Sequence, residues 1–240
     1  MTNLILALRA YKSDVDIHKH SAYQIVLSED EPFNTVCENK NHINIYGFAI
    51  KPQVAHSCQC SNSNLVILNI EPYSTLGNIL SKEIGEKRRS VHFTSQQEIS
   101  DFFHTHNKKF AIPDFIHNYK NSLPHKYDER VNKAIAYINE KFNSDKFTLD
   151  ELSGNIFLSA SRLGYLFKEQ TGSSIFKYLL WTRLRYAISQ ILTRNSKSLT
   201  EIAYESGFYD SSQMTKYMYE MFGISPSRLR QKSDLIQFLP

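Results

Sequence analysis

The sequence predicts a two-domain α+β protein, in which a small N-terminal β-barrel with helices precedes an all-α domain of two helix-turn-helix units. Three observations lead to this fold class. Short segments rich in β-branched residues dominate residues 1–72, apolar residues recur at helical spacing from residue 128 onward, and one pattern of residues occurs twice within residues 149–223. A repeat of this kind indicates two copies of one structural unit.

The N-terminal domain is predicted to span residues 1–120. Its strand-like segments are short and are separated by Asp, Asn, Ser, Gly and Pro, which is typical of a small sandwich or an open barrel. These segments are Leu4–Leu8, Tyr23–Leu27, Ile43–Ile50 and Leu65–Ile70. Residues 74–119 are expected to be mainly helical, with an interruption at Pro113, so helices should follow the barrel.

A polar linker at residues 121–128 is expected to join the two domains, and residues 129–240 then form the helical domain. In its first helix, predicted over residues 128–142, Val131, Ile135 and Ile138 have the spacing of one buried face. A second long helix is predicted over residues 174–192. The two copies of the repeat lie on either side of this helix in the sequence.

Each copy of the repeat is predicted to contain a short helix, a tight turn and a longer helix that ends at a glycine. In the first copy Ser159 is the expected cap of the long helix and Gly172 its end. In the second copy Asp210 and Gly223 take these places, and Pro226 is expected to prevent the helix from resuming. The chain should therefore contain two helix-turn-helix units.

The composition limits the function without selecting it. The formal net charge of +4 is only mildly basic, so it permits nucleic-acid binding but does not argue for it. Cys37, Cys58 and Cys60 are an odd number of cysteines, which argues against a disulfide framework. No apolar run approaches the roughly 18 residues of a membrane span, so we expect a cytoplasmic protein without a membrane partner. No nucleophile–base–acid set, phosphate loop or dinucleotide fingerprint occurs, so an enzyme is not expected.

The outward faces of the two long repeat helices favour DNA binding over a plain helical bundle. Periodicity alone fits both interpretations, because helical hairpins are common. The exposed positions, however, combine short polar side chains with Lys and Arg near a helix N-terminus, which suits base edges and phosphates in a major groove. These positions are Ser161, Arg162, Tyr165 and Lys168 in the first helix, and Ser211, Ser212, Gln213, Thr215 and Lys216 in the second. We therefore expect double-stranded DNA as a partner.

The residues of both copies resemble a known family. The segments that carry the resemblance are Ser206–Ser212 and Phe222–Pro226 in the second copy, with Leu158–Ser159, Leu166–Glu169 and Thr171–Gly172 in the first. They are similar to the signature of AraC/XylS-type transcription regulators, and the similarity covers roughly residues 131–230. The chain departs from the family at Met214 and Met218, where aromatic residues are usual. It also departs at Tyr219, where a basic residue is usual, which puts one phosphate contact in doubt.

The resemblance implies that the two long helices enter successive major grooves on one face of the duplex. It assigns base contacts to Ser161, Gly164, Tyr165, Ser211, Ser212, Thr215 and Lys216, and phosphate contacts to Arg162, Lys168, Arg183 and Arg194. Gly164 has no side chain, so the first helix should read fewer bases than usual. The resemblance also implies a contact with RNA polymerase. The oligomeric state stays open, with a homodimer as one alternative.

Histidines in the N-terminal domain form a second constellation. His18 and His20 alternate onto one face of a strand, Gln24 follows, and His56 comes later. This pattern resembles the metal-binding motif of a cupin barrel, with Gln24 in place of the usual Glu, and the domain resembles the cupin-like sensory domain of many such regulators. Neutral imidazoles suit a divalent transition metal such as zinc, iron, nickel or copper. One strong ligand is missing, so histidines that line a pocket without metal are the alternative.

The sequence thus predicts a sequence-specific DNA-binding transcription regulator that responds to a small-molecule or metal effector. Its effector would shift the population between two arrangements of the domains. Two alternatives stay open: a metal-dependent cupin enzyme fused to a DNA-binding domain, and an architectural DNA-binding protein whose front half senses nothing. Stoichiometric metal together with turnover of a small substrate would favour the enzyme.

Overall fold

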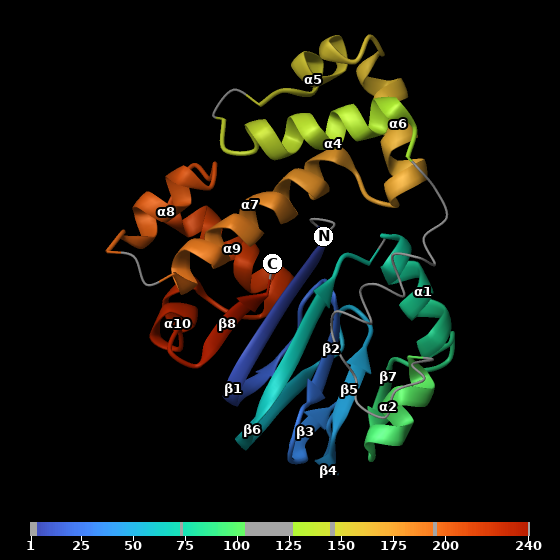
Figure 1. Cartoon of the computed structure of the whole chain (residues 1–240), viewed down its shortest axis with the longest axis vertical. Helices are drawn as coiled ribbons and strands as arrows, with labels where there is room; N and C mark the ends of the chain where they lie inside the picture. Colours follow the sequence, from blue (N-terminus) through green and yellow to red (C-terminus); the bar gives the residue numbers. More distant parts are fainter. Residues whose placement is uncertain (1–3, 73, 104–126, 145–146, 194–195, 240) are drawn as a thin grey trace.

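The computed structural model describes residues 4–72, 74–103, 127–144, 147–193 and 196–239. An antiparallel sheet with two helices forms the N-terminal domain, and helices form most of the C-terminal domain (Figure 1). The strands are β1 (Ile5–His18), β2 (Tyr23–Ser28), β3 (Phe33–Cys37), β4 (Lys40–Ile45), β5 (Gly47–Ile50), β6 (His56–Ile70), β7 (Ser90–Phe93) and β8 (Ile236–Leu239). The four segments predicted as strands are confirmed, and the segment 43–50 is divided at Tyr46 between β4 and β5.

The sheet forms a nearly closed barrel. Its strands follow the order β4-β3-β6-β2-β5-β7, and β1 pairs along the other edge of β6. The long strand β6 pairs with both β2 and β3, so it joins the two parts of the barrel. The two end strands approach each other, because His42 on β4 stacks on His92 on β7 with 3.6 Å between the ring centroids.

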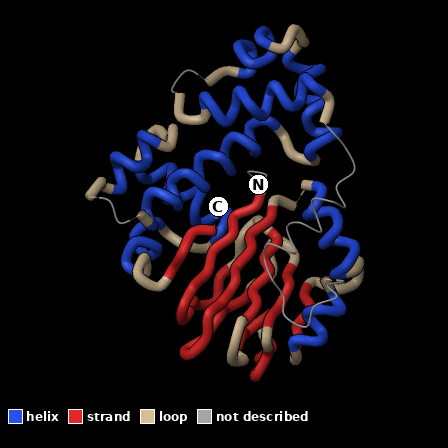
Figure 2. The backbone as a smooth tube through the Cα atoms, in the orientation of Figure 1, coloured by secondary structure: helices blue, strands red, loops and turns tan. Residues whose placement is uncertain are grey.

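Two helices, α1 (Thr75–Ile84) and α2 (Gln96–Phe102), lie along one side of the sheet (Figure 2). Leu80, Ile84 and Ile99 are fully buried there, in a core shared with the strands. The predicted helical stretch 74–119 is only partly helical, because strand β7 lies between α1 and α2. Pro113 and most of the predicted linker fall within residues 104–126, which are outside the described residues.

The C-terminal domain contains the two predicted helix-turn-helix units. Its helices are α4 (Glu129–Lys141), α5 (Leu149–Asn155), α6 (Ala160–Thr171), α7 (Ile175–Leu192), α8 (Leu199–Glu205), α9 (Ser211–Phe222) and α10 (Pro226–Gln231). The side chains of Ser159 and Asp210 cap α6 and α9 as predicted, each accepting a hydrogen bond from a backbone N–H in the first turn. Gly172 and Gly223 end the two helices in the left-handed conformation, with φ of 76° and 69°.

Pro226 has a different role from the predicted one. We expected it to keep the chain from resuming a helix, but it occupies the first position of α10, after the cap Ser225. A proline fits this position because its missing N–H would have no intrahelical partner there. None of the described helices combines the length and the apolar character that crossing a membrane requires.

Helix α7 is the scaffold that the two units share. It has 18 residues, and nine of them are buried, among them the fully buried Trp181 and Leu184. Figure 1 shows α5 and α6 near one end of α7, and α8 and α9 near the other. The helix is about 27 Å long at 1.5 Å per residue, so it holds the two units apart by a fixed distance.

The two domains share a core and a sheet. Leu4, Leu6 and Leu8 from β1 and the residue before it pack in the same apolar cluster as α4 to α10. At the C-terminus β8 pairs antiparallel with β1, so the prediction of a purely helical domain over 129–240 misses one strand. At the end of β6 the fully buried Glu71 accepts a hydrogen bond from the Trp181 indole at 2.6 Å.

Candidate nucleic-acid interface and effector site

The first helix-turn-helix unit, α5 and α6, turns its recognition surface to solvent. Helix α6 buries Leu163, Leu166 and Phe167 in the domain core. Its other face holds the predicted contact residues Ser161, Arg162, Gly164, Tyr165 and Lys168, which are exposed except for the half-buried Gly164. The Arg162 guanidinium lies 5.7 Å from the centre of the Tyr165 ring, a cation–π distance that orients both side chains.

The second unit, α8 and α9, repeats this arrangement. Met214, Met218 and Met221 fill the buried face of α9, so apolar methionines replace the aromatic residues without opening the core. The predicted base contacts lie on the other face, where Ser212 and Lys216 are exposed and Ser211 and Thr215 are half-buried. The Thr215 hydroxyl donates to the Ser211 carbonyl at 2.7 Å, so its methyl group and the lone pairs of its oxygen are left to meet a base.

The four predicted phosphate contacts differ in their surroundings. Arg162 and Lys168 are exposed on α6 and available to a ligand. Arg183 is half-buried on α7, and its Nε donates to the Phe142 carbonyl at 2.7 Å, so it joins α7 to the end of α4. Arg194 lies outside the described residues. Arg183 is therefore the weakest of the described candidates, because DNA would have to compete with an existing hydrogen bond.

Two exposed aromatic residues near the recognition helices were missing from the sequence prediction. Phe157 is 94% exposed in the turn before α6, and Tyr209 is 82% exposed directly before the cap of α9. The repeat itself held a signal for Phe157, because an offset of fifty residues pairs it with the turn glycine Gly207. A large apolar side chain in the place of a turn glycine is unusual, since φ is positive at both positions.

The structure brings three of the four predicted metal ligands together. One ring nitrogen each from His18, His20 and His56 lies within 4.8 Å of the others. His18 and His56 each have Nδ1 at a backbone carbonyl, Asp16 at 2.8 Å and Val54 at 2.9 Å, which is how metal-binding histidines are commonly oriented. Neither ring nitrogen of the buried His20 has a hydrogen-bond partner among the described residues.

Gln24 contacts the cluster as a hydrogen-bond partner of His56. Its side-chain oxygen Oε1 lies 2.9 Å from His56 Nε2, and its side-chain NH₂ group donates to Asn69 Oδ1 at 3.1 Å. Both neighbours of the His56 ring are oxygen acceptors, the Val54 carbonyl at Nδ1 and Gln24 Oε1 at Nε2, and a neutral imidazole can donate to only one of them. A metal ion at His56 Nε2 would have to replace the contact with Gln24.

Burial keeps the cluster neutral. It lowers the pKa of His20 to about 4, aided by the nearby His18, and lowers the pKa of His56 to about 2, aided by His20 and His18. The pKa of His18 is also lowered, first by burial and then by the charge of Arg228. Neutral imidazoles leave lone pairs free for a metal ion without competition from protons at neutral pH.

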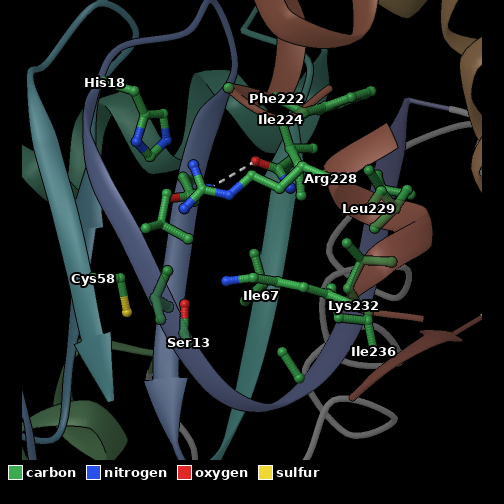
Figure 3. A pocket seen from close by; sticks show the side chains of 18 of the residues that line it. Ser13, His18, Cys58, Ile67, Phe222, Ile224, Arg228, Leu229, Lys232 and Ile236 are labelled. Carbon is green, nitrogen blue, oxygen red and sulfur yellow. Dashed lines mark hydrogen bonds between the residues drawn. The ribbon is translucent and has the colours of Figure 1, made fainter. Parts of the chain in front are cut away.

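A cavity between the domains begins beside this cluster. Its walls include Leu6, Leu8, Val26 and Ile67 from the barrel, Ile188, Phe222, Leu229 and Ile236 from the C-terminal domain, and His18, Gln24 and His56 from the cluster. Most of this lining is apolar, and the cavity has a volume of about 90 Å³. Figure 3 shows Arg228 and Lys232 extending from the helical side toward the strands. Both donate to the Asp14 carbonyl on β1, at 2.9 and 3.0 Å.

The C-terminal end of α9 is fastened to the barrel next to the cavity. The Ser21 backbone N–H donates to the Glu220 carbonyl in the last turn of α9 at 3.0 Å. Gly223 packs against the imidazole of His18, and a Cβ added to Gly223 would lie 2.6 Å from His18 Nε2. His18 thus belongs to the histidine cluster and also touches the end of a recognition helix.

Comparison with known proteins identifies a helix-turn-helix domain and several regulators that this chain resembles. Residues 152–232 match a family model described as a helix-turn-helix domain. The probable transcriptional regulator LumQ of Photobacterium leiognathi is 27% identical over 197 residues, which cover 76% of this chain and 77% of LumQ. The transcriptional activator RhaS of Shigella boydii serotype 18 is 34% identical over 106 residues, 44% of this chain but only 37% of RhaS. The solved structure of an apo ToxT variant from Vibrio cholerae covers 95% of this chain and 96% of its own, with 15% identity and a TM-score of 0.46.

The helical domain is a helix-turn-helix domain. Its two repeated units, their outward polar faces and the matched family model all agree on this. The nearly closed barrel in front of it fits a cupin-like domain. Residues 152–232 form a helix-turn-helix domain, and the chain is similar to transcription regulators such as LumQ and RhaS.

Proposed function

We propose that this chain is a sequence-specific DNA-binding transcription regulator whose DNA affinity depends on an effector held between its domains. The supporting observation is the pair of helix-turn-helix units at opposite ends of α7, each with exposed polar and cationic residues on its long helix. Such a surface suits base edges and phosphates. A DNA-binding regulator acts where the chromosome is, so we also propose a cytoplasmic location.

The spacing of the units supports simultaneous binding in two grooves. Successive major grooves on one face of B-form DNA are about 34 Å apart, and α7 separates the units by a length of similar size, about 27 Å. Base contacts are proposed for Ser161, Gly164 and Tyr165 in α6, and for Ser211, Ser212, Thr215 and Lys216 in α9. Exposed Arg162 and Lys168 are the proposed phosphate contacts.

The interdomain cavity is the proposed effector site. Its lining comes from both domains, so any occupant contacts the barrel and the end of α9 at once. The free space holds on the order of six to nine water molecules, which is the size of a small organic molecule. A larger occupant would need the domains to separate. Binding would thereby shift the population between two domain arrangements, which is how an effector changes the affinity for DNA.

A divalent transition metal is the second candidate effector. Three imidazoles within 4.8 Å of one another offer nitrogen ligands for zinc, nickel, copper or iron. A bound ion would link the end of β1 to the start of β6 through its histidine ligands. We assign it no catalytic role. Gln24 would give up its hydrogen bond to His56 in that state.

Other partners follow from the transcription function. The homologues are transcription regulators, and a regulator that activates contacts RNA polymerase, so we propose that contact for this chain as well. A homodimer is compatible with two half-sites but is not required, because one chain already holds two recognition helices. We propose no enzymatic activity.

Selection of bound fragments from random duplex DNA tests the DNA-binding function. The full chain should enrich sites that contain two short motifs about one helical turn apart. Binding to the selected site should weaken steeply with salt, because each neutralised phosphate releases counterions. The proposal would be contradicted if no motif were enriched. It would also be contradicted if a single motif were enriched and a chain with one mutated unit bound it as tightly as the parent chain.

Titration with zinc or nickel, monitored by calorimetry, tests the metal candidate. The parent chain should bind one ion, and the His56→Ala variant should bind at least tenfold more weakly, because one of three ligands is lost. The His42→Ala variant is the matched control, since His42 lies at the β4–β7 seam, apart from the cluster. Equal binding by the parent and His56→Ala would exclude the cluster as the site.

A further inference from the structure

We infer that Phe157 and Tyr209 are additional DNA-contact residues, which meet apolar groups such as thymine methyls at the edge of the two major grooves. This inference rests on the proposed DNA-binding function and extends it to residues outside the outer faces of α6 and α9. Both side chains lie within two residues of the cap of a recognition helix, Ser159 or Asp210. The N-terminal end of a recognition helix is the end that approaches base edges.

Phe157 is strained and exposed at the same time. Its φ is +59°, and in the described part of the chain it is the one aromatic residue with a positive φ. A bulky residue in this conformation is an outlier that costs stability, and its 94% exposed ring gains no burial in return. Such strain is typically retained where a side chain has a function.

The second unit shows what this turn position requires when only packing matters. Gly207 stands there with φ of +80°, and a Cβ on it would lie 2.8 Å from both Arg183 Nε and the Phe142 carbonyl oxygen. The glycine is thus needed for close packing. At Phe157 the side chain instead stands in solvent, so packing within this chain does not explain why the residue is not glycine.

Tyr209 brings an aromatic ring to the corresponding end of α9. It directly precedes the cap Asp210 and is 82% exposed, while its backbone N–H donates to the Gln213 side chain at 3.0 Å. This hydrogen bond fixes the backbone at Tyr209, so it fixes the position from which the Tyr209 side chain extends. Both units therefore place one exposed ring beside the first turn of the recognition helix, although the two turns differ by one residue in length.

Aromatic rings match one kind of base feature at a groove edge. Phenylalanine has no hydrogen-bonding group, and apolar side chains in the major groove recognise the C5-methyl group of thymine. The occupant proposed for these rings is therefore duplex DNA with thymine near the start of each half-motif. A protein partner would also bind exposed rings, but it would give no dependence on thymine methyls.

Phe157→Gly separates a structural role from a binding role. Glycine removes the strain, so the thermal midpoint should not fall, whereas affinity for the selected DNA site should drop about five- to tenfold. Tyr209→Ala should weaken binding by a similar factor, and Tyr209→Phe should keep the affinity of the parent. Ile43→Ser is the control, since Ile43 is 68% exposed on β4 in the barrel.

Replacement of thymine by deoxyuridine in the selected site identifies the contacted group. Loss of one contacted methyl should weaken the parent chain about fourfold, and should have no further effect on Phe157→Gly or Tyr209→Ala at the matching half-motif. Variants that bind as tightly as the parent, or uridine effects equal in parent and variants, would overturn the inference. If the parent chain selects no site at all, it is the DNA-binding proposal that fails.

Discussion

The two helix-turn-helix units share a pattern but differ in their attachment to the barrel. The second unit is tied to it by the Ser21–Glu220 hydrogen bond, by the packing of Gly223 on His18, and through α10 by Arg228 and Lys232 on Asp14. Between described residues, no hydrogen bond or ion pair joins α5 or α6 to the barrel. The first unit is therefore oriented by α7, and the second by α7 and the barrel together.

Under the proposed function, this difference indicates where the signal of the effector would enter the helical domain. The cavity and the histidine cluster adjoin the end of α9, so a change in the barrel first reaches the second recognition helix. Because the proposed binding mode engages two grooves together, a small rotation of α9 relative to α6 would lower the affinity for DNA. The first unit would then bind its groove in both domain arrangements, and the second unit would be the one whose binding depends on the effector.

Mild acid should have the largest effect on the barrel side of this comparison. The folded pKa values of His20 and His56 lie below the unfolded value of 6.5, so the unfolded chain binds protons first and stability falls as pH drops below 6.5. Between pH 6.5 and pH 5 the two residues should together remove about 3 kcal/mol. Denaturant unfolding with a chelator present, at pH 7.5, 6.5 and 5.0, measures this loss.

A His20→Phe variant controls for protonation elsewhere in the chain. Phenylalanine cannot bind a proton, so this variant should lose roughly half as much stability over the same pH interval. An acid sensitivity identical to that of the parent would show that His20 is not a source of the effect.

The terminal glycines of α6 and α9 give the next largest contrast. Gly172→Ala should cost only the left-handed conformation, about 1 kcal/mol, whereas Gly223→Ala should cost about 3 kcal/mol because its Cβ also collides with His18. Chemical unfolding of both variants measures the difference. Adding His18→Ala should recover most of the extra loss of unfolding free energy in Gly223→Ala and none of the loss in Gly172→Ala. An equal response at both positions would show that the contact between residue 223 and His18 does not cause the difference.

The sequence predicted local features of these units because local residues determine them. Caps such as Ser159 and Asp210, and the left-handed glycines after each long helix, depend on a few neighbouring residues. Strand β8 could not be predicted in this way, since Ile236–Leu239 is only four residues long and pairs with a strand more than 220 residues earlier. The cavity depends on the same long-range docking. Gln24 occupies the expected ligand position, yet its hydrogen bonds to His56 and Asn69 became visible only in the folded barrel.

Lys216→Ala and Tyr165→Ala compare the units as readers of DNA. Removing Lys216 should weaken binding about tenfold and lower the salt dependence by about one phosphate, because its cation is exposed on α9. Removing Tyr165 should relax sequence preference at one position of the other half-motif, at a cost of about 1–3 kcal/mol for the preferred base. Repeating the DNA selection with each variant measures both effects, and unchanged motifs and affinities would mean that other residues read the site.

Gly164 offers the smallest and most specific comparison, because Thr215 stands at the equivalent place in α9. A glycine inside a helix costs about 0.5–1 kcal/mol relative to alanine, and a Cβ on Gly164 would meet no atom within 4 Å among the described residues. Gly164→Ala should therefore raise the free energy of unfolding by that amount. Nothing in the described chain requires the glycine. If α6 approaches DNA closely at this position, the added methyl group should lower the affinity for the selected site at least threefold. Thermal unfolding and DNA titration of the same variant measure both quantities, and a gain in stability without a loss of affinity would show that the first recognition helix keeps its distance from the bases.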